Sequence, residues 1–109
     1  MAVYVDNERI EWRGRLWCHL VADSLDELHA FAARIGLRRS WFQDQASFPH
    51  YDVTIEVRER ALRAGALASN KTQMLSAARM LKAEMAVGPA KPRSVDIAPQ
   101  ALSQALSLF

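Results

Sequence analysis

The segment from Ser47 to Asp52 holds the residue types in this chain that are best suited to chemistry. It places the imidazole of His50, the phenol of Tyr51 and the carboxylate of Asp52 side by side. A carboxylate can hold an imidazole in one tautomer, and an imidazole held in this way can act as a general acid, a general base or a nucleophile. We therefore predict that His50 and Asp52 are catalytic and that Tyr51 contacts a ligand.

The other two histidines, His19 and His29, lie ten residues apart in the preceding part of the chain. His19 lies near the end of a predicted strand, which makes it a second candidate acid–base residue. His29 falls at the margin of a predicted helix and joins Asp6 and Asp23, which follow predicted strands, as candidate ligand-binding residues. A structural role stays open for each of them, because buried histidines often bond backbone carbonyls and loop carboxylates often bond backbone donors.

A divalent metal ion offers a second use for the same side chains. His19, His29, His50 and Asp52 together supply nitrogen and oxygen ligands of the kind that such ions take. Their spacing matches no established zinc or two-metal signature. The sequence therefore leaves a metal cofactor open.

The basic residues are mainly of the type that is suited to recognising phosphate. Eleven of the fourteen are arginine, whose planar guanidinium pairs with phosphate oxygens, although a genomic base bias would give the same excess. Helices predicted to start after Ser24 and Thr54 would add backbone donors. We expect a small phosphate-containing ligand, since a formal charge of only +2 does not support a nucleic-acid partner. The three tryptophans either build the core or stack on bases; they are Trp12, Trp17 and Trp41.

Alternating strands and helices must position these residues. Residues 3–5 and 16–21 predict two strands, the second buried on both faces. A helix follows between a cap at Ser24 and a stop at Gly36, and residues 40–43 predict a third strand. Such a crossover almost always joins parallel strands. The candidate site residues would then converge beyond the carboxyl ends of these strands, where open α/β sheets bind ligands.

Residues 8–15 fit two structures. They are either an irregular loop or the first arm of a hairpin that turns at Arg13–Gly14.

Two more helices complete the pattern. Thr54 predicts the cap of a helix that Gly65 ends, and Ser69 or Asn70 predicts the cap of another helix that reaches about Met85. The whole pattern predicts a small α/β domain of two or three layers, with a mainly parallel sheet of about three strands and three to four helices.

The chain is long enough for one compact domain, which we place at residues 1–86. A proline-containing linker is predicted at 87–98, and an amphipathic segment at 99–109 could join a second copy or a partner protein. The single cysteine, Cys18, and the absence of a signal-peptide pattern or a long apolar run predict a cytoplasmic protein with no membrane span.

Several short motifs resemble those of DUF4031, a family of small bacterial and phage proteins of unknown function. They are Val3-Tyr4-Val5-Asp6, Cys18-His19 with Ala22-Asp23, Glu27-Leu28-His29, Trp41-Phe42-Gln43 and Pro49-His50-Tyr51-Asp52. The resemblance covers about residues 1–82, leaves the tail outside, and implies no established activity.

The residues are compatible with three classes of function. The first is a hydrolase or transferase that acts on a phosphate-containing ligand, with His50, His19 and Asp52 at its centre. The second is a non-catalytic module that binds a nucleotide or another anion at the same place. The third is an interaction factor, of a phage or prophage type, that uses the segment 99–109.

Overall fold

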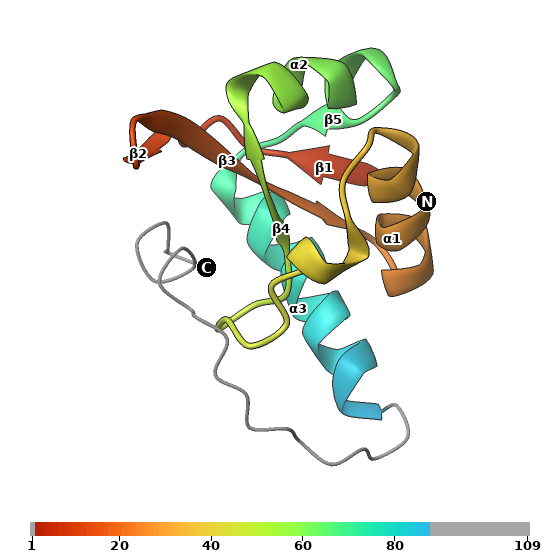
Figure 1. The fold of residues 1–109 in the computed structure, drawn as a ribbon. Helices are drawn as coiled ribbons and strands as arrows, with labels where there is room; N and C mark the ends of the chain where they lie inside the picture. The colour runs from red at the N-terminus through yellow and green to blue at the C-terminus, as the bar shows by residue number, and fades with distance from the viewer. Residues whose placement is uncertain (1, 88–109) are drawn as a thin grey trace.

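A computed structural model describes residues 2–87 of the protein, and Figure 1 shows how these residues are arranged. They form one sheet with strands β1 (Val3–Val5), β2 (Ile10–Trp12), β3 (Arg15–Ala22), β4 (Tyr51–Thr54) and β5 (Leu67–Ala68). The helices are α1 (Leu25–Arg34), α2 (Ile55–Arg63), α3 (Lys71–Val87) and a short 3-10 helix, η1 (Arg39–Trp41). The α/β class is confirmed. Most of the predicted linker and the whole segment 99–109 lie outside the described residues.

The direction of the strands differs from the prediction. β3 is the central strand and pairs antiparallel with β1, β2 and β4, whereas only β1 and β5 are parallel. The mainly parallel, three-stranded sheet is therefore wrong: the sheet has five strands within the described residues and is mostly antiparallel.

The first antiparallel pairs form because residues 8–15 belong to a hairpin. β2 and β3 are joined at Arg13 and Gly14, whose φ angles are +52° and +77°. Two consecutive left-handed residues are typical of a tight hairpin turn whose twist matches that of the flanking strands. β3 therefore runs antiparallel to β2 directly after the turn.

The strand predicted at residues 40–43 is also wrong. Residues 39–41 form η1 instead, and only Gln43 takes part in a β-bridge, with His50. The strand that pairs with β3 is β4, and it begins at Tyr51, in a segment where the sequence predicted no strand. The burial of Tyr51 and Val53 explains this, since both are 1% exposed and pack in the core, whereas Trp41 is 48% exposed.

The helices begin and end where local signals predicted. Each α-helix has a preceding side-chain oxygen that accepts a hydrogen bond from the backbone N–H three residues later. These pairs are Ser24 with Glu27 (3.2 Å), Thr54 with Val57 (3.3 Å) and Asn70 with Gln73 (2.9 Å). Gly36 and Gly65 follow α1 and α2 with φ angles of +94° and +113°, a conformation that glycine adopts without strain.

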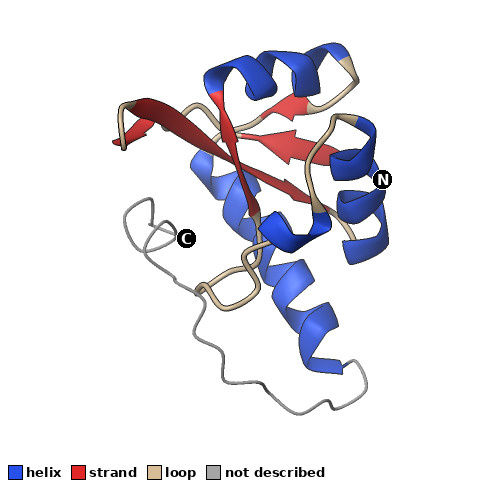
Figure 2. Cartoon of the chain, in the orientation of Figure 1, coloured by secondary structure: helices blue, strands red, loops and turns tan. Residues whose placement is uncertain are grey.

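The core lies between the sheet and the helices. In the view of Figures 1 and 2, α3 runs behind the strands and α2 lies above β1. Met74, Ala78 and Leu81 of α3 are fully buried, whereas Met85 is 36% exposed. Cys18 is buried, and its burial raises the pKa of the thiol.

Across residues 2–87, no helix is both long enough and apolar enough to cross a membrane.

The positions of Leu20 and Leu67 relative to the core predict very different effects of truncating these side chains on the free energy of unfolding. Leu20 is 0% exposed in the central strand and Leu67 is 52% exposed in β5. We expect Leu20→Ala to lower the free energy of unfolding by about 2–5 kcal/mol, because it removes buried methyl groups and leaves a cavity. Leu67→Ala, the control, should change it by no more than about 0.5 kcal/mol. Urea unfolding measures both, and equal effects would contradict this fold.

Candidate functional site

The pairing of β3 with β4 brings His19, His50 and Asp52 together. The register places His19 directly opposite Asp52, and cross-strand partners project from the same face of a sheet. His50 comes two residues before Asp52, so the alternation along an extended chain puts it on that face as well. We call these three residues the His–Asp cluster. Their convergence was predicted, but it follows from antiparallel register and not from the ends of parallel strands.

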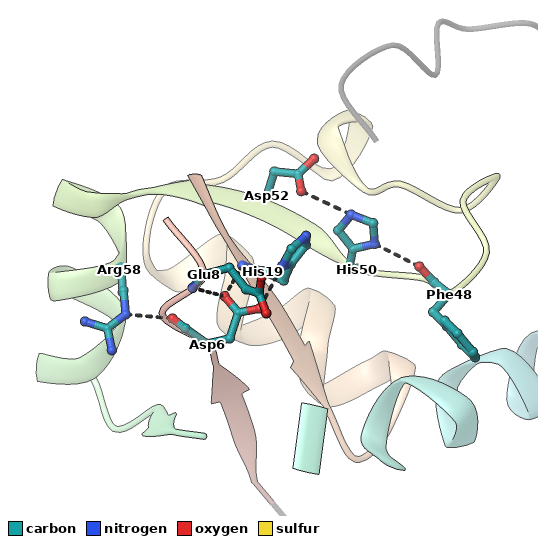
Figure 3. Close-up of polar contacts among 7 residues, drawn as sticks. All are labelled: Asp6, Glu8, His19, Phe48, His50, Asp52 and Arg58. Atoms are coloured by element: carbon teal, nitrogen blue, oxygen red, sulfur yellow. Dashed lines mark hydrogen bonds and ion pairs between the residues drawn. The ribbon is translucent and has the colours of Figure 1, made fainter. Parts of the chain in front are cut away.

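The His–Asp cluster is tight and almost completely buried. Nε2 of His50 lies 3.1 Å from Oδ1 of Asp52, and the two imidazole rings meet edge to face with centroids 5.1 Å apart. One ring nitrogen from each histidine and one oxygen of Asp52 all lie within 4.8 Å of one another. Both histidines are 0% exposed and Asp52 is 7% exposed. Figure 3 shows His19 on β3, His50 just before β4, and Asp52 facing His50.

Asp6 reaches His19 because the first arm of the hairpin bulges. Val5 pairs with Leu20 and Ile10 pairs with Trp17, so four residues of the arm, 6–9, span the distance that two residues cover in β3. Such a bulge redirects side chains away from the regular alternation. The carboxylate of Asp6 accepts hydrogen bonds from the backbone N–H of His19 at 2.8 Å and from the backbone N–H of Glu8 at 3.4 Å.

The hydrogen bonds of both rings define which ring nitrogen carries a proton. Nδ1 of His19 lies 2.7 Å from Oδ2 of Asp6, and Nδ1 of His50 lies 2.8 Å from the carbonyl oxygen of Phe48. A carbonyl oxygen only accepts, and Asp6 already accepts from two backbone groups as a carboxylate does. Each Nδ1 therefore donates, and the second nitrogen of each ring, Nε2, is the one that faces the His–Asp cluster (Figure 3).

Asp52 connects the His–Asp cluster to a cavity of about 570 Å³. Within the described part of the chain, its carboxylate oxygens accept no hydrogen bond, although Oδ1 lies close to His50. Neither histidine lines the cavity, so Asp52 is the member of the His–Asp cluster that lies at the cavity wall, with its carboxylate oxygens buried. The other lining residues are a mixture of polar, aromatic and aliphatic side chains, and they include Arg15, Trp17, Trp41, Asp44 and Val57.

The cavity also explains the position of the tryptophans. Trp17 and Trp41 line it, and none of the three tryptophans belongs to the buried core, so the core interpretation of these residues is wrong. The cavity wall formed by Trp17 also includes Thr54, its cross-strand partner.

One residue of this region was not predicted from the sequence. Arg58 of α2 is only 8% exposed, and its Nε donates to the backbone carbonyl of Asp6 at 2.7 Å. An arginine on a helix normally looks like a solvent-exposed residue. The available signal was its helical position, three residues before the buried Ala61, which places it on the inward face of α2.

The other predicted ligand-binding residues lie apart from the His–Asp cluster. Nδ1 of His29 lies 2.9 Å from the hydroxyl of Tyr51, and the ring of His29 contacts Phe42 at 4.6 Å between centroids. Tyr51 projects from the opposite face of β4 to its neighbours, because successive side chains alternate. Asp23 accepts hydrogen bonds from the hydroxyl of Tyr4 and from the backbone N–H of Ala2. The structure therefore does not bring Tyr51, His29 or Asp23 to the cluster.

His29 gives a prediction about pH. Burial lowers the pKa of His29 below its ordinary 6.5, and the nearby guanidinium of Arg39 lowers it further. The unfolded chain then binds more protons at this residue, so its contribution to stability is complete above pH 6.5 and is lost as the pH falls through the lowered pKa. We expect NMR titration to place His29 below 6.5, and His29→Gln to reduce the loss of stability on acidification. A pKa at or above 6.5 would contradict the observed packing.

Comparison with known families agrees with the motifs of the sequence. The family model described as "Protein of unknown function (DUF4031)" matches residues 3–82, which include Asp6 and the whole His–Asp cluster. No curated protein and no solved structure matches the chain significantly. Because the match covers well over half of the chain, the protein belongs to the DUF4031 family.

Proposed function

We propose that the protein binds a phosphate-containing ligand in the cavity beside Asp52 and hydrolyses it or transfers its phosphoryl group. The observation that carries this proposal is the position of Asp52, which lines the cavity and has the two buried histidines behind it. The cavity volume of about 570 Å³ lies within the range of about 300–1,000 Å³ that is usual for small-ligand sites.

The lining of the cavity supports a nucleotide or a similar ligand. Arg15 brings a guanidinium that can pair with phosphate oxygens, and Trp17 and Trp41 bring aromatic faces on which a base can stack. Trp41 is 48% exposed at this cavity, so its ring is accessible to a bound molecule. The guanidinium of Arg38 lies 5.8 Å from the centroid of the Trp41 ring and adds a second cation to this region.

Asp52 is the candidate general base. The oxygen of a water molecule, or of an acceptor hydroxyl group, attacks phosphorus while the bond from phosphorus to the leaving oxygen breaks. Asp52 takes the proton that the attacking group loses, and the leaving oxygen takes a proton from solvent. His50 and His19 are buried, so their role in this proposal is to position Asp52, not to touch the ligand.

Asp52→Asn tests the proposed catalysis. The variant keeps the shape of the side chain but cannot take a proton, so we expect turnover to fall by about 10²–10⁴-fold. The substrates are nucleoside mono-, di- and triphosphates and a chromogenic phosphodiester, and released phosphate or nitrophenol is measured. Asp23→Asn is the matched control, because Asp23 lies outside the cavity, and it should keep wild-type turnover. Equal rates in both variants would contradict a catalytic Asp52.

A second prediction concerns the aromatic wall. We expect Trp41→Ala to weaken nucleotide binding by about 1–3 kcal/mol, because base stacking on an aromatic side chain contributes about that much. Isothermal titration calorimetry measures the affinity. Trp12→Ala is the control, since Trp12 does not line the cavity, and it should bind the nucleotide as tightly as the wild type. If both substitutions weaken binding equally, stacking on Trp41 is not the cause.

The alternative function is a non-catalytic module that binds an anion or a nucleotide. The same Arg15 and tryptophan lining supports it, and it predicts tight binding with no turnover by the wild type. An interaction through residues 99–109 and a cytoplasmic location stay predictions from the sequence.

A further inference from the structure

We propose that His19, His50 and Asp52 bind one divalent transition-metal ion, with Asp6 and the carbonyl group of Phe48 as positioning partners. The ion would use Nε2 of each histidine and a carboxylate oxygen of Asp52. The role of such an ion in turnover rests on the proposed function, whereas its binding does not.

The first argument comes from the far side of each ring. Metal-bound histidines almost always donate their other ring N–H to a carboxylate or a backbone carbonyl, which fixes the tautomer and the ring orientation. His19 has the carboxylate form of this arrangement, with Asp6 at 2.7 Å, and His50 has the carbonyl form, with Phe48 at 2.8 Å. Both histidines therefore present Nε2 as the coordinating atom.

The second argument is electrostatic. The side chain of Asp52 is 3% exposed, and its carboxylate accepts no hydrogen bond from the described residues. Burial of an ionised carboxylate without such partners is strongly unfavourable unless a cation compensates it. The Nε2 atoms of both histidines face the same place. A divalent cation there would compensate the buried carboxylate.

The third argument is geometric. Bonds of about 2.0–2.1 Å from zinc to nitrogen or oxygen in a tetrahedron separate neighbouring ligand atoms by roughly 3.3 Å. The distance of 3.1 Å between Nε2 of His50 and Oδ1 of Asp52 already matches such an edge. One ring nitrogen from each histidine and one oxygen of Asp52 lie within 4.8 Å of one another, which is close to the spacing of such a site.

The ligand set also selects the ion. Two imidazole nitrogens and one carboxylate suit Zn²⁺ and other first-row transition ions better than Mg²⁺, which prefers oxygen ligands. Three protein ligands leave at least one coordination position open, as in catalytic and not structural zinc sites. Because Asp52 lines the cavity, the ion would lie beside the space where water or a phosphate oxygen can bind.

The direct test is metal content without any substrate. Tag-free protein is treated with a chelator, dialysed against Zn²⁺ or Mg²⁺, and analysed by mass spectrometry of the elements, with circular dichroism to check the fold. We expect one Zn²⁺ per chain in the wild type and in His29→Gln, the matched histidine control. Asp52→Asn and His50→Gln should each lose at least 90% of the zinc, and Mg²⁺ should not be retained.

A spectroscopic test does not depend on whether the ligand variants, Asp52→Asn and His50→Gln, fold. Wild-type protein loaded with Co²⁺ should show visible absorption bands typical of a low-coordinate site and two strongly shifted, exchangeable ring N–H signals in its NMR spectrum. Two signals are expected because both histidines keep a proton on Nδ1 when Nε2 binds the ion. No shifted signals, or signals that disappear in His29→Gln, would overturn the assignment of ligands.

Asp6→Asn tests the positioning role. Loss of a partner that orients a metal-bound histidine typically weakens metal affinity by about 10–100-fold. We expect this loss for Asp6→Asn, measured by competition with a zinc-binding dye, and no change for Asp23→Asn. Equal affinities in the two variants would refute the role of Asp6.

The metal site and the proposed catalysis can fail separately. Zinc binding with no turnover of any phosphate ester supports the metal site and removes the catalytic function. Turnover by chelator-treated protein that retains no zinc or cobalt supports the catalytic function and overturns the role of the ion in turnover. Failure of the folded wild type to retain Zn²⁺ overturns the metal site itself.

Discussion

The antiparallel register of β3 and β4 is the constraint on which the rest of the site depends. It sets His19 opposite Asp52, and the two-residue period of a strand then adds His50 on the same face. A slip of one residue would turn the β4 side chains to the other face and exchange Asp52 for Tyr51 or Val53. Packing in the core favours the observed register, because Tyr51 and Val53 are both buried and such a slip would turn both side chains away from the core.

The buried carboxylates of Asp6 and Asp52 differ in the hydrogen bonds that they accept. On the outer side of the cluster, Asp6 accepts from the backbone and the ring of His19, and Arg58 donates to the carbonyl of Asp6. The carboxylate of Asp52, in contrast, accepts no hydrogen bond from the described residues. Buried polar networks stabilise a fold only when their members have partners. A network complete on one side and open at a carboxylate is therefore better suited to a ligand than to stability alone.

Local and non-local signals explain what the sequence could predict. Ser24, Thr54 and Gly36 act within a few residues of their own position, so the ends of the helices were predicted correctly. The choice between residues 40–43 and 51–54 as a strand depends on which of them packs on β3, and neighbouring residues do not encode that. The types of the cluster residues identified them, but their arrangement required the register. Arg58 and the bulge at Asp6 depend on contacts across the fold and gave only weak local signals.

The burial of the histidines limits what they can do. A ring that is 0% exposed cannot exchange a proton directly with a molecule in the cavity, so the simplest role for His50, general acid or base, conflicts with its position. Asp52 lines the cavity, but its side chain is only 3% exposed and a single carboxylate repels a phosphate group. A metal ion held by both rings and Asp52 removes both difficulties, because it adds two positive charges where the ligand binds and needs only the lone pairs of the rings. The buried histidines, the cavity and the arginine at its wall are then consistent with one another.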